Sequence, residues 1–131
     1  MILDTSFILD LWDEKPHAIQ KARDIDARDE PIYIPTPVLY ELWEGVARSE
    51  RARAETAKVL EFAGSHDLLP FSDADAREAG LISGRLSRSG RMMGTVDVQI
   101  AGMVKARGQT LLATDRRFRE LSAEIRLEKY P

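Results

Sequence analysis

The 131-residue sequence contains no cysteine and only two histidines, His17 and His66. Disulfides, thiolate nucleophiles and cysteine-ligated zinc are therefore excluded. Each histidine stands alone in a polar context, so we expect both at the surface and no mechanism that needs a histidine pair. The lack of cysteine fits a reducing compartment, and the predicted localisation is cytoplasmic.

The chain also lacks long apolar runs and phosphate-binding glycine loops. No stretch approaches the roughly 18 apolar residues that identify a membrane span, so we expect no membrane association. The segment SGRMMG, residues 89–94, matches neither the Walker nor the dinucleotide pattern. Thr5, Ser6 and Thr114 have no paired base, which argues against a hydroxyl nucleophile.

What remains resembles an ordinary globular domain, with 44% hydrophobic and 31% charged residues. This length predicts one domain over residues 1–131. Strands are predicted at residues 2–3, 31–35, 68–71, 109–113 and 124–130. Helices are predicted at residues 7–12, 16–28, 37–48, 51–64, 73–87, 95–107 and 116–121, with Thr36 and Ser72 as the N-caps of the third and fifth. The alternation predicts an α/β fold of three layers, with helices on both faces of a mainly parallel sheet.

The net charge of −3 does not suggest a nucleic-acid-binding protein, but the charge is unevenly distributed. Residues 85–119 contain eight lysines and arginines and two acids, a local charge of +6 that leaves −9 elsewhere. Solvated helix faces explain any single arginine equally well, but the asymmetry as a whole favours a polyanionic partner. The arginines expected to contact that partner are Arg85, Arg88, Arg91 and Arg116.

The two acids of this basic segment, Asp97 and Asp115, belong to a set of four at unusual positions. Asp4 and Asp115 directly follow the apolar runs in MILDTS and LLATDRRF. Both positions are predicted carboxyl ends of strands, where ligands bind in open α/β sheets. Glu41 lies beside the apolar face of the helix PVLYELWEGV, and Asp97 lies on the apolar face of TVDVQIAGMV.

Each acid also has a purely structural explanation. Asp4 and Asp115 suit helix caps or turns, Asp97 suits the positive end of a helix, and Glu41 suits a solvated boundary. Four carboxylates gathered near a core nevertheless need a cation. Oxygen ligands without cysteine or clustered histidine select Mg²⁺ or Mn²⁺ over Zn²⁺. The sequence therefore predicts a metal-dependent enzyme, and Gly45, a poor helix former, predicts a close approach near Glu41.

These blocks, in this order and spacing, resemble the PIN domain, specifically the VapC-type toxins of bacterial and archaeal toxin–antitoxin pairs. MILDTSFILDLW resembles the opening strand with its first acid, and IPTPVLYELWEGV resembles the second block with Glu41. GTVDVQIAGMVKARGQTLLATDRRF resembles the third and fourth blocks, with Asp97 and Asp115. The resemblance covers essentially the whole chain. It departs from many relatives at Asp115, where asparagine is common.

The resemblance implies a Mg²⁺- or Mn²⁺-dependent endoribonuclease of three-layer PIN-like fold. It also implies a homodimer and a tight complex with a small VapB-like antitoxin whose tail blocks the active site. The implied catalytic and metal-binding residues are Asp4, Asp97, Glu41 and Asp115, the first two closest to the metal. The implied supporting hydroxyl residues are Thr5, Ser6 and Thr114. Transfer, ribosomal and messenger RNA all remain open as substrates.

Other functions need features that this sequence lacks or fits less well. A catalytically silent PIN-like RNA-binding or assembly module is the alternative, and the four acids weigh against it. A phospho-receiver domain needs a paired acid after the first strand and a lysine after the last, and neither is found. A haloacid-dehalogenase-like phosphatase needs Asp-x-Asp, but Ser6 stands two residues after Asp4. Four aromatic residues are expected in the core, at a dimer contact or in an antitoxin groove: Phe7, Trp12, Tyr40 and Trp43.

Overall fold

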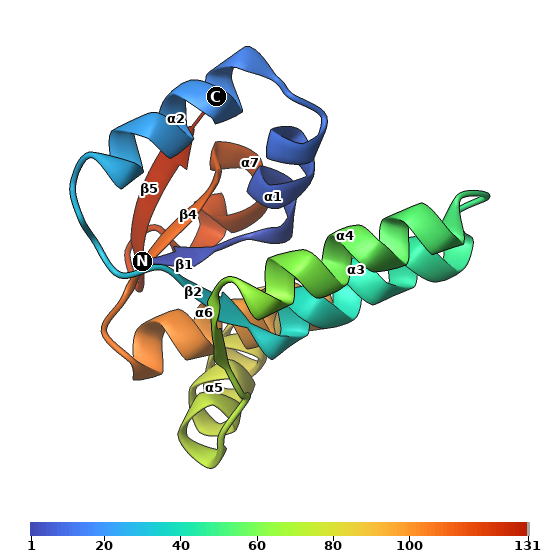
Figure 1. Ribbon diagram of the computed structural model, residues 1–131. Coiled ribbons are helices and arrows are strands. Elements are labelled where there is room, and N and C mark those ends of the chain that lie inside the picture. The colour runs from blue at the N-terminus through green and yellow to red at the C-terminus, as the bar shows by residue number, and fades with distance from the viewer. Residues whose placement is uncertain (131) are drawn as a thin grey trace.

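The computed structural model describes residues 1–130, except for the side chain of Asp115. Its centre is a five-stranded sheet in the order β3-β2-β1-β4-β5, in which every neighbouring pair is parallel. The strands are β1 (Ile2–Leu3), β2 (Tyr33–Pro35), β3 (Asp67–Leu69), β4 (Thr110–Thr114) and β5 (Arg126–Tyr130). The predicted α/β fold with a mainly parallel sheet is confirmed (Figure 1).

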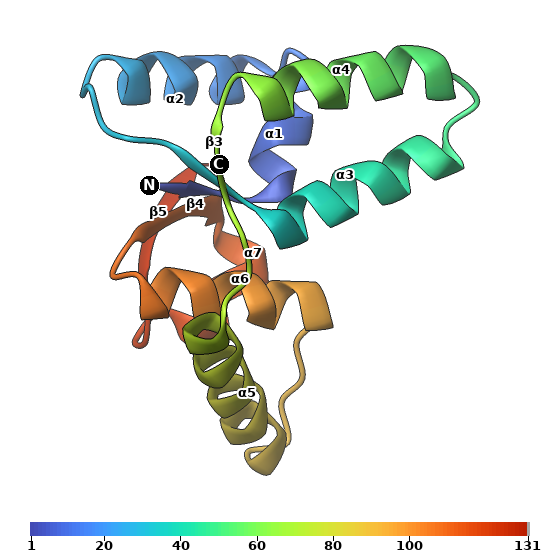
Figure 2. The same ribbon diagram turned by 60° about the horizontal axis from the view of Figure 1, so that its bottom comes forward.

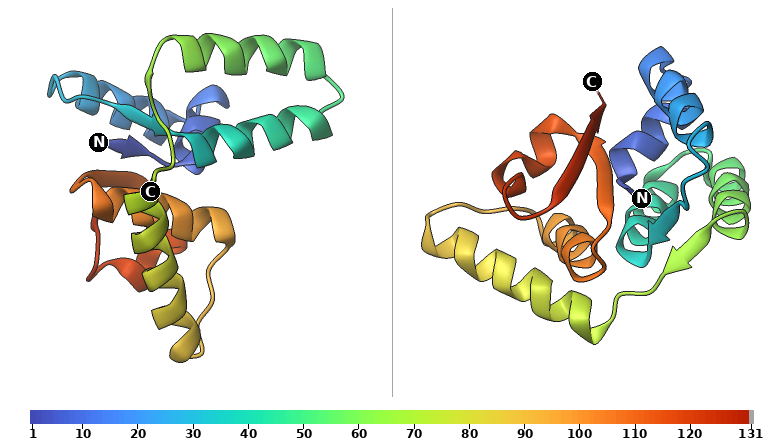
Figure 3. Two further views of the ribbon diagram at one scale, coloured as in Figure 1. Left: turned by 90° about the horizontal axis from the view of Figure 1, so that it is seen from below. Right: turned by 90° about the vertical axis from the view of Figure 1, so that its left-hand side faces the viewer.

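Helices cover both faces of this sheet. They are α1 (Thr5–Trp12), α2 (Pro16–Asp26), α3 (Thr36–Arg48), α4 (Ala52–Gly64), α5 (Asp73–Arg88), α6 (Thr95–Ala106) and α7 (Asp115–Phe118), which a 3-10 turn (Arg119–Leu121) follows. Figure 2 shows α1 and α2 on one face and α6 and α7 on the other. The α3–α4 hairpin and α5 leave this body in different directions (Figure 3). Within residues 1–130, no helix is long and apolar enough to cross a membrane.

The core lies at the two central strands, because both faces of β1 and β4 are covered. Ile2 and Leu111 have no exposed surface. Phe7 of α1 and Ile100 of α6 are also fully or almost fully buried. Burying each such side chain stabilises the fold by about 1.5–3 kcal/mol. The core therefore fixes α1 and α6 firmly, and both helices carry polar residues at the same edge of the sheet.

The strand order reverses between β1 and β4. The chain runs outward from β1 to β2 and β3, then crosses to β4 and β5. Parallel sheets bind ligands beyond the carboxyl ends of the strands at such a switch point. The Asp4 N–H donates to the Leu112 carbonyl of β4 at 3.0 Å. The helix α7 begins directly after the last residue of β4. Asp4 and the start of α7 therefore lie at one edge.

Several predicted boundaries differ from the structure. α1 begins at Thr5 rather than Phe7, so no turn separates Asp4 from the helix. β3 ends at Leu69 rather than residue 71, because Pro70 has no N–H to donate to a strand ladder. Thr36 lies inside α3 and does not cap it. Its hydroxyl instead accepts a hydrogen bond from the Phe71 N–H at 3.2 Å.

The helix α5 is fastened to the body through α6. Its predicted cap, Ser72, is confirmed and forms a capping box with Asp75. Asp75 is buried and accepts a hydrogen bond from Arg107, at the end of α6, at 2.9 Å. Gly102 of α6 faces α5 directly, since a Cβ there would lie 2.6 Å from the Ala79 nitrogen. No other described part of the chain closely approaches Gly45, because a Cβ there would meet nothing within 4 Å beyond its own helix.

Candidate active site

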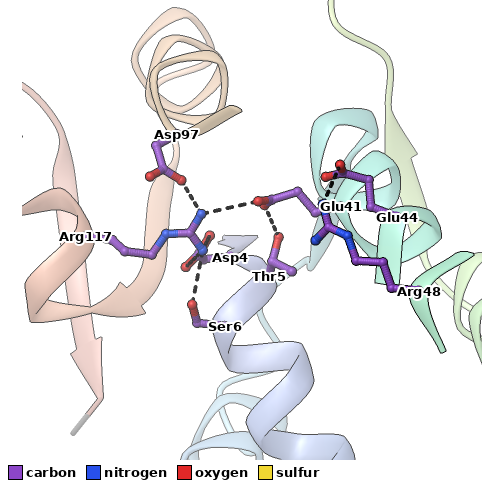
Figure 4. A network of polar contacts seen from close by, with 8 residues as sticks. All are labelled: Asp4, Thr5, Ser6, Glu41, Glu44, Arg48, Asp97 and Arg117. Carbon is purple, nitrogen blue, oxygen red and sulfur yellow. Dashed lines mark hydrogen bonds and ion pairs between the residues drawn. The ribbon is translucent and has the colours of Figure 1, made fainter. Parts of the chain in front are cut away.

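Three of the four predicted acids meet at the carboxyl edge of the sheet, and each comes from a different element. Asp4 follows β1, Glu41 lies on α3, and Asp97 lies in the first turn of α6 (Figure 4). The Asp4 side chain has no exposed surface. Those of Glu41 and Asp97 are 22% and 17% exposed. The site is thus a partly buried acidic cluster, and its most buried carboxylate lies at the strand end.

The guanidinium of Arg117, from α7, lies between these carboxylates (Figure 4). Its Nη1 is 3.3 Å from Asp4 Oδ2. Its Nη2 is 3.5 Å from Glu41 Oε2 and donates a short hydrogen bond to Asp97 Oδ1. A cation therefore stands among the acids, as the sequence predicts, but it belongs to the protein itself.

Sequence reasoning counted Arg117 only as one residue of the basic segment and missed this position. A signal was nevertheless present, since Arg117 lies two residues after Asp115. That spacing places it in the first turn of the helix that begins at the end of β4. A long side chain in this turn can reach the crevice at the strand ends.

The charges of the site depend on burial as well as on one another. The pKa of Asp4 is raised to about 6, chiefly by burial; the charge of Arg117 opposes this rise, and the charges of Asp97 and Glu41 add to it. Burial lowers the pKa of Arg117, but its carboxylate neighbours more than compensate, and its pKa lies above the ordinary value. The guanidinium therefore stays charged and offsets part of the cost of burying Asp4.

The purely structural explanations do not account for these acids. Asp4 occupies the N-cap position of α1, yet its side chain makes no capping hydrogen bond. α6 is capped by Gly94, and Asp97, in its first turn, points to Arg117 instead. Glu41 is not a solvated boundary residue, because it contacts both Arg117 and a buried hydroxyl. All three side chains turn toward one point.

The predicted supporting hydroxyls take three different positions. Thr5 is buried, and its hydroxyl donates to Glu41 Oε1 at 2.6 Å, which fixes that carboxylate from behind. Ser6 accepts from Arg117 Nη1 at 3.1 Å and so holds the guanidinium rather than an acid. Thr114 precedes α7, and its side chain makes no capping hydrogen bond there.

The fourth predicted acid, Asp115, has its side chain outside the described part of the structure. Its backbone opens α7 directly after β4, at the same edge as Asp4. Among the side chains that the structure describes, no three carboxylates or imidazoles stand close enough together to hold a metal as they are. The guanidinium occupies the space between them. Their donor chemistry nevertheless fits a divalent ion, because hard carboxylate oxygens already surround a cation.

The four predicted nucleic-acid-binding arginines divide into two pairs. Arg85 forms an ion pair with Glu124, and Arg91 forms one with Glu120. The side chains of Arg88 and Arg116 are exposed. Part of the basic excess is thus offset by the chain's own acids, although exposed ion pairs of this kind contribute little energy and can open.

The aromatic residues and histidines take several different positions. Phe7 is a core residue, whereas Tyr40 and Trp43 are 55% and 38% exposed on α3. Both histidines are half-buried rather than on the open surface: His17 stacks on Tyr130, and His66 packs on Phe62. Neither position suggests a catalytic base for the site.

A groove of about 230 Å³ lies between α1, α3 and α4. Its lining is mostly apolar and includes Leu9, Trp12, Leu42 and Val59. Glu41 also lines it, so the groove reaches the acidic cluster. A partner that fills the groove would therefore also lie beside the candidate site.

The known proteins that this chain resembles in sequence or fold carry VapC or VapBC names. The chain is 26% identical over 129 residues to the tRNA(fMet)-specific endonuclease VapC of Shigella flexneri, covering 98% of this chain and 96% of that protein. The VapBC2 structure from Rickettsia felis, bound to a promoter DNA fragment, matches with a TM-score of 0.86 at 22% identity. That match covers 99% of this chain and 98% of the other.

A third match is VapBC-5 from Mycobacterium tuberculosis, of the VapBC family of toxin-antitoxin systems, with a TM-score of 0.64. It is 26% identical and covers 75% of this chain and 79% of the other. The family model described as PIN domain matches residues 1–124. With a match over almost its entire length, this chain belongs to the PIN domain family.

Proposed function

We propose that this protein is an endoribonuclease that hydrolyses RNA phosphodiesters with carboxylate-bound Mg²⁺ or Mn²⁺. The observation that carries the proposal is the convergence of Asp4, Glu41 and Asp97 on one cation at the carboxyl edge of a parallel sheet. The name of the Shigella flexneri relative, a tRNA-specific endonuclease, supports RNA as the substrate. Such a protein acts where RNA is, in the cytoplasm.

The three described acids, with Asp115, are the residues that would hold the metal. When bound, the metal would activate water and stabilise charge on the departing oxygen of the phosphodiester. The chain's own part is to bind and orient. Asp4 is fixed by burial and by its N–H bond to β4. Thr5 fixes Glu41, so that the carboxylates are in place before substrate arrives.

The RNA backbone would be held by basic side chains near the acidic cluster. Arg116 is exposed on α7, next to Arg117 in sequence. The loop of residues 89–94 joins α5 to α6, which carries Asp97; the loop contains Arg91 and Met92, and Met92 is 91% exposed. Cationic side chains at these places would position phosphates without reading sequence.

We further propose that the protein is the toxin of a toxin–antitoxin pair, in which a VapB-like antitoxin occupies the groove between α1, α3 and α4. The groove has the apolar lining that an amphipathic helix requires. Because Glu41 lines it, the bound segment would also block the acids. A homodimer is part of the same proposal and would cover Tyr40 and Trp43, which are exposed on α3.

The test is RNA cleavage by the purified protein in Mg²⁺ or Mn²⁺ and in EDTA. We expect cleavage with metal and none in EDTA. Asp97→Asn should reduce the rate by about 100-fold or more, since even partners outside the ligand set cost 10–100-fold. Asp73→Asn is the matched control, because Asp73 also lies in the first turn of a helix but is exposed. Equal rates for the two variants would remove Asp97 from the site.

The alternative is a catalytically silent RNA-binding or assembly module. The observation that favours it is that Arg117 already compensates the acids without a metal. This alternative expects no cleavage with any divalent ion and unchanged RNA affinity in Asp97→Asn. Metal-dependent cleavage by the unaltered protein excludes it.

A further inference from the structure

Arg117 is the one described side chain that contacts all three described acids of the site (Figure 4). Its two terminal nitrogens have different partners: Nη1 contacts Asp4 and Ser6, and Nη2 contacts Glu41 and Asp97. These are the oxygens that would have to bind a divalent ion. A guanidinium and a metal cannot use them at once, because Mg²⁺ needs its ligands at about 2.0–2.1 Å.

The charges favour occupation by one cation or the other. Without Arg117, three carboxylates would face one another, one of them fully buried. An unpaired buried charge is costly. The guanidinium lowers that cost by one charge, and a divalent ion would lower it by two. The metal-free protein thus has a cation among the acids, but this cation carries one positive charge where a divalent ion would carry two.

The Arg117 side chain can move away from the carboxylates while the protein stays folded. Phe118, the next residue, has no exposed surface and anchors α7 in the core. The Arg117 side chain itself is 27% exposed, so it borders solvent. Rotation of its flexible stem would free the carboxylates while the helix backbone stays in place.

We propose that Arg117 is a built-in cation that competes with the divalent metal for these carboxylates. It stabilises the metal-free protein and must be displaced before the metal binds, so it sets the metal affinity. This inference rests on the proposed metal-dependent function. It assigns Arg117 the role of a positioning residue that controls when the ligand set becomes available.

The test measures Mn²⁺ binding to the full-length protein by titration calorimetry, at fixed pH and ionic strength and without RNA. Arg117→Gln should bind Mn²⁺ at least about 10-fold more tightly than the unaltered protein, within the usual range of coupling between two ligands. Arg117→Lys keeps the charge with fewer donors and should show a smaller gain. Arg119→Gln, an exposed residue of the following turn, changes the net charge equally and should bind like the unaltered protein.

Thermal unfolding supplies a second measurement that does not depend on activity. In EDTA, Arg117→Gln should melt at a lower temperature than the unaltered protein, and Mn²⁺ should raise its melting temperature by more. Equal or weaker Mn²⁺ binding by Arg117→Gln overturns the inference. If that variant does not fold, Arg117→Lys decides in the same way.

The two proposals fail separately. If Arg117→Gln binds Mn²⁺ more tightly but the protein never cleaves RNA, the competition between Arg117 and the metal is supported and the proposed nuclease activity is rejected. Absence of Mn²⁺ binding in every variant would overturn both. If the protein cleaves RNA with metal but Arg117→Gln binds Mn²⁺ with unchanged affinity, the proposed nuclease activity is supported and the competition is rejected.

Discussion

At the scale of single residues, Asp4 is the most constrained group of the site. It is fully buried, and its pKa is raised to about 6 chiefly by that burial. A raised acid pKa means that the folded protein holds a proton which the unfolded chain has already released. The contribution of Asp4 to stability is therefore greatest below pH 4 and is lost as the pH rises toward about 6.

Asp4→Asn should remove this pH dependence. Two pKa units correspond to a loss on the order of 3 kcal/mol between pH 4 and pH 7. In EDTA, the melting temperature of Asp4→Asn relative to the unaltered protein should therefore rise across that window. Calorimetry at a series of pH values measures the difference directly. A difference that stays flat with pH would show that Asp4 ionises alike in the folded and unfolded states.

The residue scale is also where sequence reasoning reached its limit. Asp4 could be predicted, because an acid that directly follows an apolar run is visible in the local sequence. The partners of Arg117 could not, because they lie about 20 to 113 positions away in the chain. The same limit applies to Arg85 and Arg91, whose acidic partners come from the segment after α7. Local patterns predict where a backbone turns, but not which distant charge a long side chain meets.

At the scale of elements, α6 links two parts of the molecule. It carries Asp97 at its start, packs on β4, and supports α5 through Gly102. Its helix was predicted well, since Gly108 ends it with a positive φ of 61°. The contact between the two helices was not predictable, because a glycine inside a helix signals only that something is near. Gly45 gave the same signal, but no other described part of the chain closely approaches it.

Gly102→Ala should be destabilising by about 1–3 kcal/mol, because the added methyl would overlap the backbone of Ala79. The matched control is Gly84→Ala in α5, where a Cβ would meet no described atom within 4 Å. That change should stabilise the protein by up to about 1 kcal/mol through helix propensity. Urea unfolding of both variants tests the pair. Equal effects of the two changes would mean that α5 shifts freely over α6.

The groove between α1, α3 and α4 gives a second prediction at this scale. Leu9 is 46% exposed and lines the groove, so Leu9→Glu would place a charge in an apolar contact. Affinity for the proposed antitoxin should fall by at least about 10-fold, while RNA cleavage persists. Leu60→Glu is the control, because Leu60 is 59% exposed on α4 and does not line the groove. Calorimetric titration with the purified antitoxin measures both, and equal losses would place the partner elsewhere.

At the scale of the whole molecule, the uneven charge is partly balanced by folding. Lysines and arginines of the basic segment pair with acids from other segments in five cases: Arg85, Arg91, Lys105, Arg107 and Arg117. The sequence alone showed the excess of +6 but not this pairing, which depends on the tertiary fold. The field that RNA would meet is thus smaller than the sequence suggests.

Charge reversal should distinguish an exposed arginine from one that forms an ion pair within the protein. Arg116→Glu should weaken RNA binding in EDTA more at low than at high salt, and flatten the salt dependence by about one phosphate contact. Arg85→Glu, at a residue already paired with Glu124, should have a smaller effect on that slope. Fluorescence anisotropy with a labelled RNA over a range of salt concentrations gives both slopes. Identical slopes would mean that the ion pair of Arg85 opens when RNA binds.

The position of β1 has a consequence for synthesis. This strand of two residues lies at the centre of the sheet, where Ile2 pairs with Tyr33 on one side and Leu111 on the other. A ribosome releases the first strand early, but its partner β4 emerges only near the end of translation. Almost the entire chain must therefore be synthesised before Asp4 can lie beside Asp97 and Arg117. A nascent or prematurely terminated polypeptide contains the first acids without the assembled site, so the proposed nuclease site cannot form until translation is nearly complete.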